Sequence, residues 1–152
     1  MNRRHGSHMR AALPILLATA SWGGDAFGIW KLNPGRSTLA ASLKTISLRI
    51  EPHARGEVFT LETVARDGRV STSSTILYLD GKARDFEDAA CSGTQSSWRV
   101  DERTVEIARE CMGGGKVRLV RRSVNPVVLT LDVTEQHPDG RRSEQRLVLE
   151  KH

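Results

Sequence analysis

Aromatic side chains and long apolar runs are both scarce in this chain. Its 152 residues include three Trp, three Phe and one Tyr. So few aromatic side chains argue against a nucleic-acid binder that stacks bases on aromatic rings. The longest apolar run, residues 11–20, has about ten residues, roughly half the length that a helix needs to span a bilayer. We therefore expect no membrane-spanning segment, and no stable membrane anchor, because no cysteine directly follows the run to carry a lipid.

The chain also lacks a recognisable catalytic or metal-binding motif. His53 and His137 each lie beside a proline in a predicted turn, and neither has a second histidine or an acidic motif at metal-ligand spacing. No Gly-x-Ser-x-Gly elbow is present, and the three glycines at 113–115 lack the strand-to-helix setting of a phosphate loop. The sequence therefore predicts no enzyme, no metal and no cofactor.

The N-terminus has the order of features that marks a secretory signal. Arg3, Arg4 and Arg10 precede the apolar run, and Ala18-Thr19-Ala20 gives the small-x-small site that a signal peptidase accepts. The alternative, a buried N-terminal helix, does not require this order. We predict a signal peptide at 1–20, a short flexible segment at 21–26, and a periplasmic or secreted mature protein.

Much of the basic charge lies in this leader. The whole chain has a formal net charge of +5, and the leader contributes its arginines without any acidic residue. The remainder is close to neutral, whereas a nucleic-acid-binding domain usually has a concentrated basic face. No nucleic-acid partner is expected.

After the leader, apolar residues alternate with polar ones. Residues 46–50 and 127–133 place apolar side chains at every second position, which is the period of a strand with one buried face. Turn signals such as Asp67-Gly68 and Pro138-Asp139-Gly140 separate the runs. The pattern predicts an all-β domain, a single antiparallel meander of about eight to nine strands that closes into a barrel and so removes unpaired edges. Residues 82–97 are polar and irregular, and we expect a long loop or a broken strand there.

The interior of such a barrel is the expected binding site. A barrel of about eight strands can hold one small ligand or be filled by its own side chains, and mostly apolar walls suit an apolar or amphipathic ligand. We expect Arg121 to point outward, because an unpaired buried charge is costly. If it points inward, it could pair with a ligand carboxylate. The alternation also turns Ile76 inward, and the candidate ligand-binding residues are Phe59, Leu61, Tyr78, Trp98, Leu119 and Leu129.

The chain has two cysteines, Cys91 and Cys111. An even number of cysteines in an exported chain favours a disulfide over two unpaired thiols. If residues 101–103 turn a hairpin, a bulge of one or two residues would bring the two cysteines opposite each other. We predict a disulfide, with two free thiols as the alternative.

The run Gly28-Ile29-Trp30-Lys31-Leu32-Asn33-Pro34 resembles a known opening. It is similar to the GTWKLNPAKS opening of a group of small, exported, lipocalin-like bacterial proteins, and weaker likeness continues to about residue 151. This chain has Ile29 where the pattern has Thr, and Gly35-Arg36 where it has Ala-Lys. The resemblance implies a lipocalin-like β-barrel domain over residues 27–152.

Gly28-Ile29-Trp30 also resembles the Gly-x-Trp signature of the lipocalin superfamily. There the Trp closes one end of the barrel and a basic side chain from the last strand covers its ring. The resemblance implies structural roles for Gly28 and Trp30, with Arg146 or Lys151 as the covering cation.

These observations lead to one expectation and two alternatives. We expect a non-enzymatic binding protein that holds a small hydrophobic ligand in its barrel. The first alternative is a structural or interaction barrel of the cell envelope with a filled core, and the second is an enzyme that works at the barrel mouth. Oligomeric state has no signal in the sequence.

Overall fold

The computed structural model describes residues 26–152, and the predicted signal peptide lies outside the described residues, as do residues 21–25 of the flexible segment. Within residues 26–152, ten antiparallel strands follow one another, with one turn of 3₁₀ helix, η2 (Pro34–Arg36), after the first strand. The strands are β1 (Gly28–Leu32), β2 (Leu43–His53), β3 (Gly56–Ala65), β4 (Val70–Leu77), β5 (Arg84–Glu87), β6 (Ser92–Asp101), β7 (Thr104–Cys111), β8 (Lys116–Asn125), β9 (Val128–Gln136) and β10 (Arg142–Lys151).

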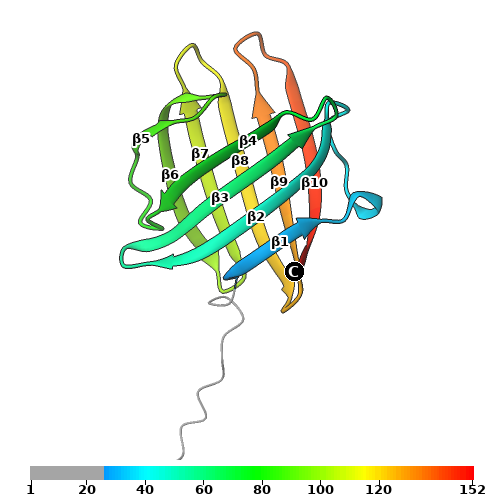
Figure 1. The fold of residues 1–152 in the computed structure, drawn as a ribbon. Helices are drawn as coiled ribbons and strands as arrows, with labels where there is room; N and C mark the ends of the chain where they lie inside the picture. Colours follow the sequence, from blue (N-terminus) through cyan, green and yellow to red (C-terminus); the bar gives the residue numbers. More distant parts are fainter. Residues whose placement is uncertain (1–25) are drawn as a thin grey trace, which may run out of the picture.

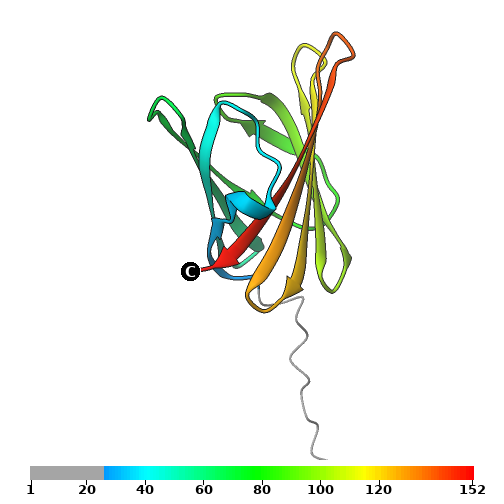
Figure 2. The ribbon, with the colours of Figure 1, turned by 90° about the vertical axis from the view of Figure 1, so that its right-hand side faces the viewer.

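The sheet curls into a barrel that is open along one seam. Its strand order is β4-β3-β2-β1-β10-β9-β8-β7-β6-β5, so β1 and β10 pair and bring the two ends of the domain together (Figure 1). From the side, β2, β3 and β4 form one wall and β7, β8 and β9 form the facing wall (Figure 2). β4 and β5 stand at the two ends of the order without a shared backbone ladder, and we call the space between them the strand gap.

The all-β meander and its barrel shape confirm the predicted fold, with two corrections. The strands number ten, not eight to nine. Residues 82–97, expected as a long loop or a broken strand, contain β5 and the first part of β6. β5 is only four residues long and buries a single side chain, Phe86, so its alternation is too short to detect in the sequence.

Three of the turns use the same local device. The side-chain Oδ1 of Asp67, Asp101 and Asp139 each accepts a hydrogen bond from the backbone N–H two residues later, at 3.0, 2.8 and 3.0 Å. An aspartate that bonds its own turn in this way replaces a backbone partner and fixes the reversal. Gly68 and Gly140 follow with φ of 88°, a conformation that suits glycine.

Trp30 on β1 is fully buried and pairs with Lys151 at the end of the last strand. Its side chain is 1% exposed, and its indole N–H donates to the carbonyl of Ala26 at 2.9 Å. The Lys151 ammonium lies 5.7 Å from the ring centroid, whereas Arg146 lies outside the barrel and pairs with Asp132 at 2.8 Å. Of the two candidate cations, the structure therefore places Lys151 over the ring.

The described part of the chain contains no helix with the length and apolar character that crossing a bilayer would require.

Candidate functional site

The lower half of the barrel interior, next to Trp30, is filled by apolar side chains. Several of the largest are less than 2% exposed, so they leave little room for a ligand among them. These side chains come from both walls of the barrel and include Phe59, Leu48, Ile50, Leu77, Ile107, Leu129, Leu131, Leu147 and Leu149.

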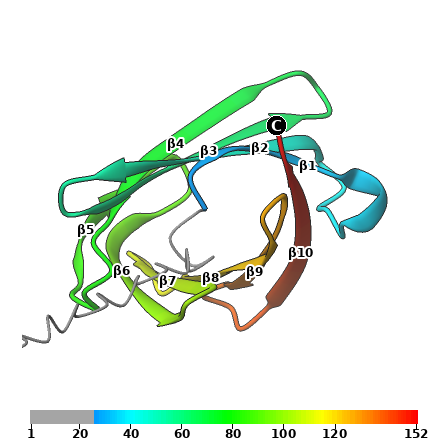
Figure 3. The ribbon, with the colours of Figure 1, turned by 90° about the horizontal axis from the view of Figure 1, so that it is seen from below.

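A buried ion pair crosses this filled half. The strands β3 and β8 lie on opposite walls of the barrel (Figure 3). Glu57 on β3 and Arg121 on β8 meet at 2.8 Å between Oε2 and Nη1. Their side chains are 5% and 2% exposed. Arg99 approaches the same carboxylate at 3.6 Å. The outward orientation expected for Arg121 is therefore wrong, because Glu57 supplies the partner whose absence would have made burial costly.

The other end of the barrel is more open, and we call it the mouth. The turns after β7 and β9 lie at this end (Figure 1). Three inward apolar side chains here, Leu61, Val117 and Val133, are only half-buried, and all three pack against the core below. We call them the mouth walls. They are partly exposed apolar groups that a ligand could cover.

Side chains bridge the strand gap where the backbone does not. The Gln95 amide on β6 donates to the Thr75 hydroxyl on β4 at 3.1 Å, and the Ser73 hydroxyl donates to Asp88 at 3.4 Å. Lower down, the backbone of Leu79 donates to the Ser97 hydroxyl at 3.0 Å. The seam of the barrel is thus closed by individual polar side chains.

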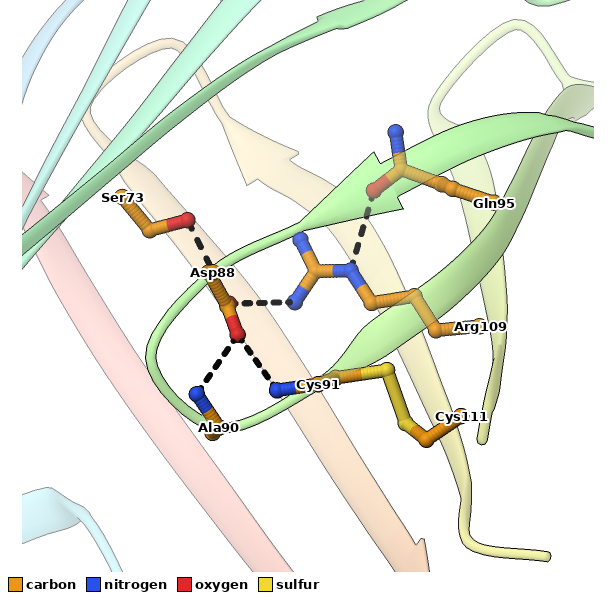
Figure 4. The surroundings of a disulfide bond; sticks show 7 residues. All are labelled: Ser73, Asp88, Ala90, Cys91, Gln95, Arg109 and Cys111. Atoms are coloured by element: carbon orange, nitrogen blue, oxygen red, sulfur yellow. Dashed lines mark hydrogen bonds and ion pairs between the residues drawn. A yellow bond between two sulfur atoms is a disulfide. The ribbon is translucent and has the colours of Figure 1, made fainter. Parts of the chain in front are cut away.

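Residues 88–91, which we call the strap, form a tight turn beside this gap (Figure 4). The Asp88 Oδ1 accepts from the backbone N–H groups of Ala90 and Cys91 at 2.8 and 2.7 Å. The disulfide between Cys91 and Cys111 then joins the strap to the end of β7, which confirms the predicted bridge. The strap is therefore held at both of its ends.

Removing this disulfide is expected to destabilise the domain. The Cys91→Ser/Cys111→Ser double variant should lose about 3 kcal/mol of unfolding free energy, since the bridge closes a loop of about 20 residues in the unfolded chain. Urea unfolding of the oxidised protein and the double variant measures the loss. Wild-type protein unfolded in a reductant is the control and should match the variant. A double variant as stable as the oxidised protein would contradict this account.

Arg109 on β7 lies inside the barrel behind the strap. Its side chain is 10% exposed, and its Nε donates to the Gln95 side chain at 2.9 Å. Its guanidinium carbon stands 4.2 Å from the centroid of the Phe86 ring, and its Nη1 lies 3.9 Å from Asp88. Burial lowers the pKa of Arg109, and the charge of Asp88 offsets part of that effect.

A pocket of about 190 Å³ opens at the strand gap. Its lining includes Tyr78, Lys82 and Arg84 together with the buried Gln95 and Ser97. Arg84 covers the Tyr78 ring at 3.8 Å and forms two hydrogen bonds with Asp80, at 2.9 and 2.7 Å. The pocket is smaller than the 300–1,000 Å³ or so typical of small-molecule sites. Arg84 and the Tyr78 ring, which a ligand of this pocket would contact, are already packed against each other.

The structure separates the six candidate ligand-binding residues into three groups. Leu61 belongs to the mouth walls. Phe59, Leu119 and Leu129 lie in the filled half, at 1%, 2% and 0% exposure. The remaining two, Tyr78 and Trp98, do not face the interior.

The inward assignment of Ile76 and Trp98 is wrong because it shifts β4 and β6 by one residue. Tyr78 follows the end of β4, and Arg84 covers its ring there. Polar side chains, among them Thr75 and Gln95, take the inward positions and bond to each other across the gap. Next to the seam, polar side chains therefore share the inward face with buried apolar ones such as Leu77 and Phe86.

Sequence reasoning missed Glu57 and Arg109, although each leaves a signal. Glu57 shares strand parity with Phe59 and Leu61, and Arg109 shares it with Ile107. When one charged residue stands among apolar residues that face the same side of a strand, it is either buried with a partner or placed at an end of the barrel.

Comparisons with known proteins identify the fold. No family model and no curated protein matches the sequence. The crystal structure of wild-type fluorescent protein UnaG superposes with a TM-score of 0.56 at 12% identity, covering 85% of this chain and 98% of UnaG. The crystal structure of a UnaG mutant gives a TM-score of 0.57 at 12% identity, covering 85% of this chain and 97% of the mutant. The structure of EF1p2_mFAP2b bound to DFHBI gives 0.50 at 12% identity, covering 87% and 98%. At these identities, the likeness shows the shared barrel fold alone.

Proposed function

We propose that this chain is an exported, non-enzymatic binding protein that holds a small hydrophobic or amphipathic molecule in the mouth of its barrel. The observation that carries the proposal is the contrast between the two halves of the interior. The lower half is filled, whereas the mouth walls leave Leu61, Val117 and Val133 half-buried. A ligand that covers these three side chains would gain roughly 25 cal/mol for each Å² of apolar surface removed from water.

Two further observations support parts of this proposal. The signal-like N-terminus and the Cys91–Cys111 disulfide both fit an oxidising compartment outside the cytoplasm. The barrel is also the fold of EF1p2_mFAP2b, a structure solved with the small molecule DFHBI bound.

One observation favours the alternative, a structural or interaction barrel without a small-molecule ligand. The buried side chains and the Glu57–Arg121 pair fill the half of the interior that lies next to Trp30. A ligand must therefore fit at the mouth alone, and a mouth that binds nothing would leave a stable, self-contained domain.

Native mass spectrometry of the protein purified from its own host separates these functions. The expected mass is that of a chain beginning at Ser21 with one disulfide, together with an adduct that organic extraction removes. An unextracted protein that shows only the bare mass favours the structural alternative. A chain that retains residues 1–20 contradicts the export part of the proposal.

A matched pair of variants places the ligand at the mouth. Leu61→Gln is expected to weaken the binding of Nile red, a neutral apolar fluorescent probe, by about tenfold, because it removes apolar contact worth about 1.4 kcal/mol. Val64→Gln, on the outer face of the same strand, should bind the probe like the wild type. Fluorescence titration measures both affinities. Equal weakening by the two variants, or none in either, would refute the placement.

A further inference from the structure

Arg109 is a cation inside the barrel whose partner acid is shared with other groups. Among residues 26–152, Asp88 is the acid that pairs with it, at 3.9 Å, near the outer limit of an ion pair. The same carboxylate also holds the strap, since its Oδ1 accepts from two backbone N–H groups, of Ala90 and Cys91, and its Oδ2 accepts from Ser73. The guanidinium is thus deeply buried but only loosely compensated.

The other buried cation of the described barrel, Arg121, is matched more closely. Arg121 meets Glu57 at 2.8 Å in the filled half. The inward acid on the other side of Arg109 is Glu135, but the register places Val117 and its strand between the two residues. Neither Glu57 nor Glu135 neutralises Arg109.

Two apolar side chains of the mouth are connected to this cation by the strand ladders. Val117 lies directly across from Arg109 in the β7–β8 ladder. Leu61 lies directly across from Ser73, whose hydroxyl bonds the carboxylate that faces Arg109. A molecule bound at the guanidinium would therefore have half-buried apolar groups of the mouth beside it.

We propose that Arg109 binds the anionic head group of the ligand, so that the barrel selects an amphipathic molecule with one carboxylate or similar monoanionic end. The anionic head accepts hydrogen bonds from the Arg109 guanidinium, which Asp88 approaches only to 3.9 Å. The apolar tail covers Val117 and Leu61. This assignment rests on the proposed binding function and adds the ligand class. Charge-assisted hydrogen bonds of this kind are short and strong in a site sheltered from water.

A pair of ligands with the same chain tests the head group. Dodecanoate and 1-dodecanol compete with Nile red for the full mature protein, and we expect dodecanoate to bind about tenfold more tightly. Arg109→Gln should abolish this preference and leave the dodecanol affinity within about twofold of the wild type. Arg118→Gln is the matched control, because it removes the same charge from an outward side chain of the neighbouring strand that pairs with Glu106.

Two further variants keep the test decisive if Arg109→Gln unfolds. Arg109→Lys retains the charge and should retain part of the preference. Asp88→Asn keeps a side-chain acceptor for the strap but removes the competing charge, so it should tighten dodecanoate binding a few-fold without changing dodecanol binding. Thermal unfolding of each variant identifies any that do not fold.

The outcomes separate the inference from the function on which it rests. If dodecanol binds as tightly as dodecanoate in the wild type, or if Arg109→Gln weakens both equally, the binding function stands and the head-group assignment fails. If neither ligand displaces Nile red and the probe itself does not bind, the proposed function fails.

Discussion

Replacing Glu57 by alanine is expected to destabilise the barrel by about 3–5 kcal/mol, which would leave a domain of this size close to unfolding. The substitution strands Arg121 in the filled half of the interior, at 2% exposure. Arg99 also reaches this carboxylate, but it is a second cation and cannot neutralise Arg121. Urea unfolding followed by circular dichroism measures the loss.

Replacing both partners should reverse most of this loss. A Glu57→Leu/Arg121→Met variant removes the two charges together and fills the space with apolar side chains, and such replacements of buried pairs are often neutral or stabilising. Glu62→Ala, an exposed acid on the outer face of the same strand, is the control and should change stability by less than about 0.5 kcal/mol. A double variant no more stable than Glu57→Ala would show that the pair does not act through its charge.

This ion pair also shows where sequence reasoning stops. Strand parity is a local property, and it places Arg121 with Leu119 on one face of β8. Whether that face can hold a charge depends on what the opposite wall supplies. Glu57 is distant in sequence and reaches Arg121 only after the barrel has closed. The outward orientation of Arg121 was expected because an unpaired buried charge is costly. It was wrong because the tertiary fold brings Glu57 to Arg121.

Alternation also fails to predict which side chains face inward beside the seam, for a related reason. Along β8, β9 and β10 the apolar set faces the core, and alternation predicts their orientation. Beside the strand gap, Thr75 and Gln95 face inward because they replace the missing backbone ladder with side-chain hydrogen bonds. Tyr78 and Trp98 then fall on the other parity. A sequence does not mark which two strands lie at the seam, so the inward polar side chains there cannot be assigned from alternation alone.

The disulfide was predictable because the even number of cysteines and the turn at residues 101–103 both favoured it. The Asp101 turn fixes the β6–β7 hairpin, and its register pairs Gly93 with Cys111. Cys91 lies just beyond the end of that ladder, and the strap turns it back toward β7. A Cβ on Gly93 would come within 1.9 Å of the Glu110 carbonyl oxygen, so this close strand approach depends on glycine. That the strap positions Asp88 near Arg109 could be seen only in the structure.

Trp30→Ala is expected to cost about 3–5 kcal/mol, the range for deleting a fully buried aromatic side chain. The indole is 1% exposed, and three separate interactions end with its removal: apolar packing against the filled half, the hydrogen bond to Ala26, and the contact with Lys151. Its loss also leaves the Ala26 carbonyl without its partner.

Trp98→Ala provides a control of the same residue type. Trp98 is half-buried on the outer face of β6, so its loss exposes a surface that was already in contact with water. We expect less than half of the destabilisation seen for Trp30→Ala. If the two alanine variants unfold at the same urea concentration, then Trp30 is one aromatic among several. If Trp30→Ala loses stability while Lys151→Met has nearly the stability of the wild type, apolar packing and the indole hydrogen bond stabilise this end of the barrel, and the cation does not.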